Sequence, residues 1–242
     1  HGPYDDPRSF VELDDFSRKH ENHNLILNLD LSEHRLVSLT SYGTSLMNWD
    51  IDVDEQGVFP TLRDAYLVQE TERFAQEVRL ESTQDRGWEY MVGVYHLDSK
   101  KRGDTDFRVF NLLLESESKQ VQTGIFTSHK FALSDRSTFQ IGLRWQSYED
   151  WRLKTDQVIK DESVTWSTQY SYDFSDDIMG YVSYQKGYRP QGLVNAGTVT
   201  VAANLDPELS AYPEEESGSV EFGLKALTFD GRLQTSINIY RQ

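Results

Sequence analysis

The chain has 242 residues, a formal net charge of −16 and no cysteine. The negative charge disfavours binding to nucleic acid, and the lack of cysteine excludes disulfides, thiolate catalysis and cysteine-based zinc sites. No run of about eighteen apolar residues is present, which excludes membrane-spanning helices. Hydrophobic residues make up 37% of the chain and aromatic residues 12%, which suits either a soluble protein or a membrane barrel whose strands turn alternate residues to lipid.

The first residues, His1-Gly2-Pro3-Tyr4-Asp5-Asp6, lack the basic start and the apolar segment of a signal peptide. We therefore expect the chain to be an internal piece of a longer precursor. Its length is enough for one large β domain, although length alone would also allow two.

Residues of one face recur at every second position along most of the chain. A period of two predicts β-strands with one apolar and one polar face. In chain order the sets are Leu25, Leu27, Leu29 and Leu31; Phe74, Val78 and Leu80; Val121, Thr123, Ile125 and Thr127; Phe139, Ile141, Leu143 and Trp145; Val164, Trp166, Thr168, Tyr170, Tyr172 and Phe174; Val220, Phe222, Leu224 and Ala226; and Leu233, Thr235, Ile237 and Ile239. We predict about ten strands, many longer than the usual 5–6 residues.

The charged stretch from Glu70 to Glu81 also admits a helical reading. However, Phe74, Val78 and Leu80 keep one parity through it. We therefore predict a strand here, and no helix of useful length anywhere in the chain.

The predicted connections fall into two classes that alternate strictly along the chain. Short turns are predicted at Ser32–Glu33, Asp85–Gly87, Ser134–Asp135, Ser175–Asp177 and Asp230–Gly231, where the residues suit tight turns. Long loops are predicted at Asp50–Thr71, Lys100–Ser118, Glu149–Asp161 and Gln191–Glu215. Such alternation places all short turns at one rim and all long loops at the other. It predicts an all-β fold: an antiparallel, up-and-down transmembrane β-barrel segment of about ten long strands that is an incomplete barrel.

In a barrel of this kind the two faces of each strand have different surroundings. We expect the apolar set on the convex, lipid-facing surface: Val164, Trp166, Tyr170, Phe139, Ile141, Leu143, Phe222 and Leu224. We expect the polar set on the concave surface: Gln140, Arg144, Gln169, Ser171, Glu221 and Lys225. Aromatic residues beside the short turns predict an interfacial girdle, with cross-strand packing in a soluble sheet as the alternative: Trp88, Phe131, Phe139, Phe174, Tyr181 and Phe229.

The sequence offers little for catalysis or metal binding. The acidic run Asp50–Glu55 could supply oxygen ligands to calcium, but Gly57 comes one place too late for the EF-hand pattern, and we interpret the run as a solvated loop. His20 and His23, three residues apart, are interpreted as an accidental pair. No phosphate-binding loop or nucleophile arrangement is present. We therefore predict no enzyme activity, no catalytic or metal site and no cofactor.

A family resemblance rests on the hairpin Tyr172–Gly192 and on further segments, which follow one another along the chain in the order found in that family. These segments are Gln76–Ser82, Trp88–Tyr95, Gly142–Trp145, Tyr212–Glu214, Glu221–Lys225 and Phe229–Leu233. Together, from about Leu25 to the end, they resemble the barrel of TonB-dependent outer-membrane receptors. The resemblance implies that residues 1–242 are part of a receptor β-barrel domain, without the plug domain, the TonB-contacting segment and the closing C-terminal strands.

The resemblance also implies a function. Such receptors lie in the outer membrane of Gram-negative bacteria and import ferric siderophores, haem, cobalamin or certain glycans with energy from TonB. The expected partners are a ferric siderophore or similar chelate, outer-membrane lipid, and TonB through the plug region, with no nucleic acid. The family holds ligands by the plug, the extracellular loops and the upper barrel wall, so Tyr188, Arg189 and Asn195 are the candidate ligand contacts. The alternatives are a passive or structural barrel, porin-like or adhesin-like, and a soluble carbohydrate-binding β protein.

Overall fold

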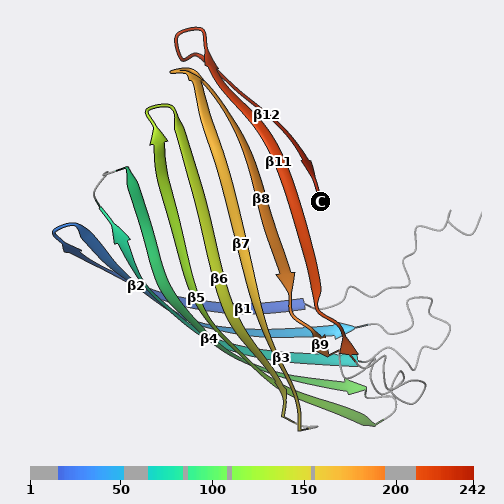
Figure 1. Cartoon of the computed structure of the whole chain (residues 1–242). Coiled ribbons are helices and arrows are strands. Elements are labelled where there is room, and N and C mark those ends of the chain that lie inside the picture. Colours follow the sequence, from blue (N-terminus) through green and yellow to red (C-terminus); the bar gives the residue numbers. More distant parts are fainter. Residues whose placement is uncertain (1–15, 52–64, 84–86, 108–110, 154–155, 194–210) are drawn as a thin grey trace, which may run out of the picture.

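Ten long strands form one antiparallel sheet in the computed structural model, which describes residues 16–51, 65–83, 87–107, 111–153, 156–193 and 211–242. Their order is β1-β2-β3-β4-β5-β6-β7-β8-β11-β12, and the sheet is open, with β1 and β12 at its edges (Figure 1). The strands are β1 (Phe16–Leu31), β2 (His34–Ile51), β3 (Ala65–Ser82), β4 (Trp88–Phe107), β5 (Leu112–Ser134), β6 (Ser137–Arg152), β7 (Gln157–Ser175), β8 (Ile178–Arg189), β11 (Glu215–Thr228) and β12 (Leu233–Arg241).

Neighbours in sequence pair with neighbours in space throughout this sheet. The short strands β9 (Gly192–Leu193) and β10 (Ala211–Tyr212) pair with each other, outside the sheet, between β8 and β11. The predicted all-β, up-and-down class is confirmed, and the segment Glu70–Glu81 lies in β3, as predicted. Among the described residues, no helix is long and apolar enough to cross a membrane.

Four of the five predicted short turns lie where the sequence predicts them, and most of the fifth, Asp85–Gly87, lies outside the described residues. Two residues each join β1 to β2 and β7 to β8, which suits tight hairpins. Ser32 in the first of these turns has a φ of 43°, and Gly231 in the β11–β12 turn has a φ of 82°. Both values lie in the left-handed region, which glycine enters without steric cost. In Figure 1 these turns gather at one end of the strands.

At the opposite end the strands run further than predicted. β4 continues to Phe107 and β5 begins at Leu112, although Lys100–Ser118 was predicted as a loop. Likewise β6 and β7 take up most of the predicted loop Glu149–Asp161. The charges that suggest loops are paired across strands: Lys119 Nζ lies 2.9 Å from Asp98 Oδ2, and Arg102 Nε lies 3.2 Å from Glu117 Oε1. Opposite charges on facing strands support a sheet without any apolar face.

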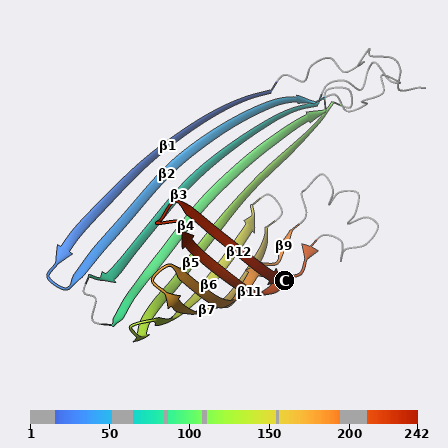
Figure 2. The same ribbon diagram turned by 90° about the horizontal axis from the view of Figure 1, so that it is seen from above.

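The side chains on the two faces of the sheet differ in exposure. The sheet is curved, as Figure 2 shows. On one face Leu143 is 47% exposed and Phe222 is 61% exposed, whereas on the other face Val37 is 4% exposed and Asp150 is 2% exposed. A curved sheet spreads side chains on its convex face and crowds them on its concave face, so the apolar set lies on the convex side. The registers agree, because they place Phe139 opposite Tyr170 and Leu143 opposite Trp166.

Of the predicted girdle residues, Trp88 and Phe131 form an aromatic cluster with His129 on the convex face. Trp88 stacks on Phe131 at a centroid distance of 6.2 Å, and its Nε1 donates a hydrogen bond to His129 Nδ1 at 3.2 Å. Tyr181, predicted to belong to the same girdle, instead lies on the concave face, where its hydroxyl donates to Glu221. Its ring covers Gly223, where an added Cβ would clash with the ring carbons. The prediction for Tyr181 was wrong because its position in the strand is one place out of step with the aromatic set.

Candidate ligand-binding surface

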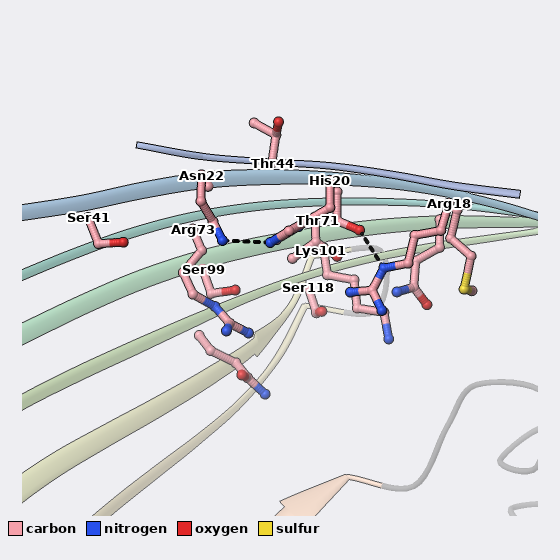
Figure 3. A pocket seen from close by; sticks show the side chains of 15 residues that line it. Arg18, His20, Asn22, Ser41, Thr44, Thr71, Arg73, Ser99, Lys101 and Ser118 are labelled. Atoms are coloured by element: carbon pink, nitrogen blue, oxygen red, sulfur yellow. Dashed lines mark hydrogen bonds between the residues drawn. The ribbon is translucent and has the colours of Figure 1, made fainter. Parts of the chain in front are cut away.

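A polar hollow of about 650 Å³ lies on the concave face, at the loop end of β1 to β5 (Figure 3). We call it the basic hollow. Its lining residues are Arg18, His20, Asn22, Ser41, Gly43, Thr44, Ser45, Met47, Gln69, Thr71, Arg73, Ser99, Lys101, Ser118 and Gln120. Thr44 borders the basic hollow through its backbone, because its side chain points away from the hollow in Figure 3.

The strand register creates the hollow by placing small residues beside long ones. Arg73 lies between Gly43 of β2 and Ser99 of β4, and Lys101 lies between Thr71 of β3 and Ser118 of β5. Residues that face each other across strands share one face of the sheet. The long basic side chains therefore stand next to short ones, and open space remains between them.

The basic hollow has an unusual charge for this acidic chain, because no Asp or Glu lines it. Within the described ranges, Arg18, Arg73 and Lys101 form no ion pair. Arg18 Nε donates a hydrogen bond to Ser45 Oγ at 3.2 Å, a neutral partner. By contrast, Arg79, lower on the same face, bonds to Glu77 at 2.7 Å and to Glu81 at 2.5 Å.

A second group of polar side chains lies beside the hollow, towards β6, β7 and β8. We call it the tyrosine–carboxylate cluster; its members are Tyr148, Asp150, Arg152, Asp161, Tyr188, Arg189, Tyr212 and Glu215. Asp150 lies opposite Gln120 in the ladder, and Arg152 Nη2 donates to Asp150 Oδ2 at 3.4 Å. The carboxylate at the border of the hollow therefore already has a cationic partner.

Burial and neighbouring carboxylates raise the pKa values of two tyrosines of this cluster, Tyr148 and Tyr188. The cluster lies beyond the apolar band, where convex neighbours such as Glu149 and Lys160 are charged. Burial, followed by the charge of Asp150, raises the pKa of Tyr148 to about 12. Burial and a hydrogen bond donated to Asp161 raise the pKa of Tyr188 above its ordinary value. Asp161 Oδ2 also accepts a hydrogen bond from the backbone N–H of Gln191 at 3.1 Å.

Two of the predicted ligand contacts lie in this cluster, and both are engaged by the protein itself. Arg189 Nη1 lies 3.3 Å from Glu215 Oε2, and its guanidinium lies 4.8 Å from the centroid of the Tyr212 ring. Tyr188 is held by Asp161. Asn195 lies outside the described residues. Ligand contact by these three residues stays a prediction, and the sequence reasoning missed the basic hollow altogether.

The histidine and carboxylate groups do not gather into a metal site in the part of the chain that the structure describes. His20 and His23 have opposite parity in β1, since His20 faces Ser45 and His23 faces Tyr42 in the register. Their side chains therefore project from opposite faces of the sheet. Most of the acidic run Asp50–Glu55 lies outside the described residues.

An open wall of long antiparallel strands, apolar outside and polar inside, defines part of an outer-membrane type of β-barrel. The family model described as "TonB dependent receptor-like, beta-barrel" matches residues 1–242. The chain belongs to this family of receptors.

Solved structures support the same fold at low sequence identity. The ferric yersiniabactin uptake receptor FyuA from Yersinia pestis aligns with a TM-score of 0.71 and 13% identity over 93% of this chain and 35% of that one. The siderophore receptor PiuA from Acinetobacter baumannii gives 0.69 and 16%, over 92% and 40%. The alcaligin outer membrane receptor FauA from Bordetella pertussis gives 0.68 and 18%, over 94% and 37%.

The chain thus spans well under half the length of the solved receptors that it matches. No curated protein sequence matches it significantly.

Proposed function

We propose that this chain forms part of the barrel wall of an active transporter in the outer membrane of a Gram-negative bacterium. The transporter binds a scarce nutrient, a ferric siderophore or a similar chelate, and imports it with energy supplied through TonB. The observation that carries this proposal is the pairing of an apolar convex band with a polar concave wall in a chain of the TonB-dependent receptor family. Siderophore receptors among the similar structures support the choice of cargo.

The convex band is proposed to face lipid. Val94, Ile125 and Val164 are each more than half exposed on this face, and burying them in a bilayer removes apolar surface from water. Trp88, beside the turns, suits the headgroup layer, where rings with a polar edge are favoured, and Phe131 stacks on it. The short turns would then lie in the periplasm and the other rim outside the cell.

The concave wall is proposed to line the passage and to contribute to binding, not to catalysis. TonB would act on the plug region of the complete receptor, and this wall would hold the cargo from the side. The basic hollow and the tyrosine–carboxylate cluster both lie at the rim where the cargo arrives. A surface in such a place needs only to bind and release its ligand.

Uptake of radioactive iron by cells that produce the complete receptor tests this proposal. Accumulation of a ferric siderophore should require both the receptor and TonB, whereas binding at the cell surface should require only the receptor. The matched control is the same strain without TonB. Accumulation that continues at the same rate without TonB would favour the passive, porin-like barrel instead.

A further inference from the structure

We propose that the basic hollow is an oxyanion subsite: it binds carboxylate groups of a multiply anionic, aliphatic ligand. The inference rests on the proposed function, because it names the chemical class of cargo that this part of the wall receives. It also makes a claim that the function alone does not, since a receptor could equally hold a neutral or a cationic chelate. The carrying observations are the charges, the geometry and the side-chain types of the hollow.

The basic hollow gathers cationic side chains in an acidic chain. The chain carries 40 acidic and 24 basic residues, so carboxylates outnumber basic groups. Lys119, Lys130 and Lys160 each lie 2.9 Å from a carboxylate. In the described part of the chain, Arg18, Arg73 and Lys101 have no such partner although they lie within one hollow. Like charges gathered without counter-charges repel one another, and a bound anion would remove that repulsion.

The geometry favours carboxylate over a simple counter-ion. Arg18 and Arg73 carry planar guanidinium groups, which can donate two parallel hydrogen bonds to one carboxylate. Lys101 adds a third cation from the neighbouring strand position, and its side chain extends to the same side as those of Arg18 and Arg73 in Figure 3. Hydroxyl groups of Ser45 and Thr71 stand between these cations in the ladder and can donate further hydrogen bonds.

The side-chain types argue for an aliphatic ligand. No Phe, Tyr or Trp lines the hollow, although the chain has 13 Tyr and 12 Phe. A catecholate chelate is anionic as well, but its rings gain much of their binding from stacking on aromatic side chains. On the concave face, Phe16 and Trp49 lie one ladder step beyond the hollow. Their rings pack against each other, with centroids 6.4 Å apart. The hollow therefore offers a ligand positive charges and hydrogen-bond donors, and its lining residues offer no aromatic ring to stack on.

Two adjacent lysines supply a matched pair of variants. Lys101 lines the hollow, whereas Lys100 is next to it in β4 and shares the convex face with Glu72. The substitutions Lys101→Gln and Lys100→Gln remove the same charge from the same strand, one residue apart. Arg73→Gln tests a guanidinium of the hollow. Gel mobility with and without heating shows whether each variant barrel is folded.

The experiment measures binding to the purified complete receptor. The probes are the ferric chelate of citrate, which is an aliphatic carboxylate, a ferric tricatecholate, a neutral ferric trihydroxamate, free citrate and inorganic phosphate. We expect Arg73→Gln and Lys101→Gln each to weaken binding of ferric citrate roughly tenfold, because each removes a charge-assisted contact. We expect Lys100→Gln to change it less than about twofold, because exposed charges on the far face are screened.

These binding and uptake measurements separate the oxyanion subsite from its alternatives. Equal effects of Lys100→Gln and Lys101→Gln, or equal weakening of the neutral trihydroxamate, would overturn the oxyanion subsite. Phosphate binding as tight as that of citrate, with the same sensitivity to Lys101→Gln, would replace carboxylate with phosphate and so overturn the assignment to carboxylate. Uptake of some ferric chelate through TonB without any effect of the hollow variants would leave the proposed function standing and overturn this inference. If no ferric chelate is taken up, the proposed function fails, and free citrate binding still decides the subsite.

Discussion

Two regions near the same rim of this sheet are built on the same strands but give their charges opposite roles. On the convex face beyond the apolar band, basic and acidic side chains neutralise one another, as Lys119 and Asp98 do. On the concave face near the same rim, Arg73 and Lys101 stand without a carboxylate in the described residues. A paired charge is already occupied by its partner, whereas an unpaired charge in a hollow remains available to a ligand. The difference teaches that side-chain type alone does not indicate function, because the face and the partner decide it.

The largest expected effect comes from placing a charge on the convex face of β6. Leu143→Arg places a charge in the convex band, and we expect it to impair assembly of the complete receptor, because Arg at the bilayer midplane of a barrel costs roughly 2–4 kcal/mol. Gln140→Arg, in the same strand but on the concave face, is the matched control and should assemble normally. An outer-membrane assembly assay measures both. Normal assembly of Leu143→Arg would contradict the assignment of the convex face to lipid.

The next effect separates scaffold from ligand contact in the tyrosine–carboxylate cluster. Tyr188→Phe removes the hydrogen bond to Asp161, and we expect the free energy of unfolding to fall by about 1.5–3 kcal/mol, because the acceptor is charged. The pKa of Tyr188 is raised in the folded state, so this stabilisation is complete below the ordinary tyrosine pKa of about 10 and is lost at higher pH. The difference between wild type and variant should therefore shrink in alkaline denaturant titrations.

The same variant also tests the predicted role of Tyr188 in ligand contact. Ligand binding that is unchanged in Tyr188→Phe would assign the residue to the scaffold. Binding that is lost while unfolding is unaffected would assign it to the ligand instead.

A further prediction concerns the connection between β8 and β11. The predicted loop Gln191–Glu215 includes residues that hold the wall, since Glu215 pairs with Arg189, so the deletion is best limited to residues 194–210 with a short Gly-Ser replacement. We expect substrate uptake to fall while the barrel still assembles, because a rim connection adds little to the strand ladder. Uptake and assembly assays run side by side test this. Full uptake by the deletion variant would show that the connection is not needed for import.

The smallest effect is expected for a paired charge on the convex face. Arg102 lies 3.2 Å from Glu117, and its side chain is 67% exposed. Exposed ion pairs contribute about 0–1 kcal/mol and less at high salt, so Arg102→Gln should barely change the denaturation midpoint or ligand binding. An effect on binding as large as that of Lys101→Gln would contradict the distinction between paired charges on the convex face and unpaired charges in the basic hollow.

Sequence periodicity was enough to predict the wall. The alternation in Val164–Phe174 and the turn Ser175–Asp177 both appear in the structure as β7, its turn and β8. A period of two assigns side chains to faces through local geometry alone. It could not indicate that Arg102 still belongs to a strand, because its ion pair is with Glu117 on the neighbouring strand.

By itself, the sequence determined the class of fold, the faces of the strands and the family, because these depend on local alternation, turn chemistry and the order of short segments. Only the tertiary structure decided which residues meet. Arg73 and Lys101 are 28 positions apart, and the β3–β4 register brings their ladder positions together beside small residues of β2 and β5. Tyr188 likewise reaches Asp161, 27 positions earlier. Such contacts depend on strand register over long separations, and periodicity leaves that register open.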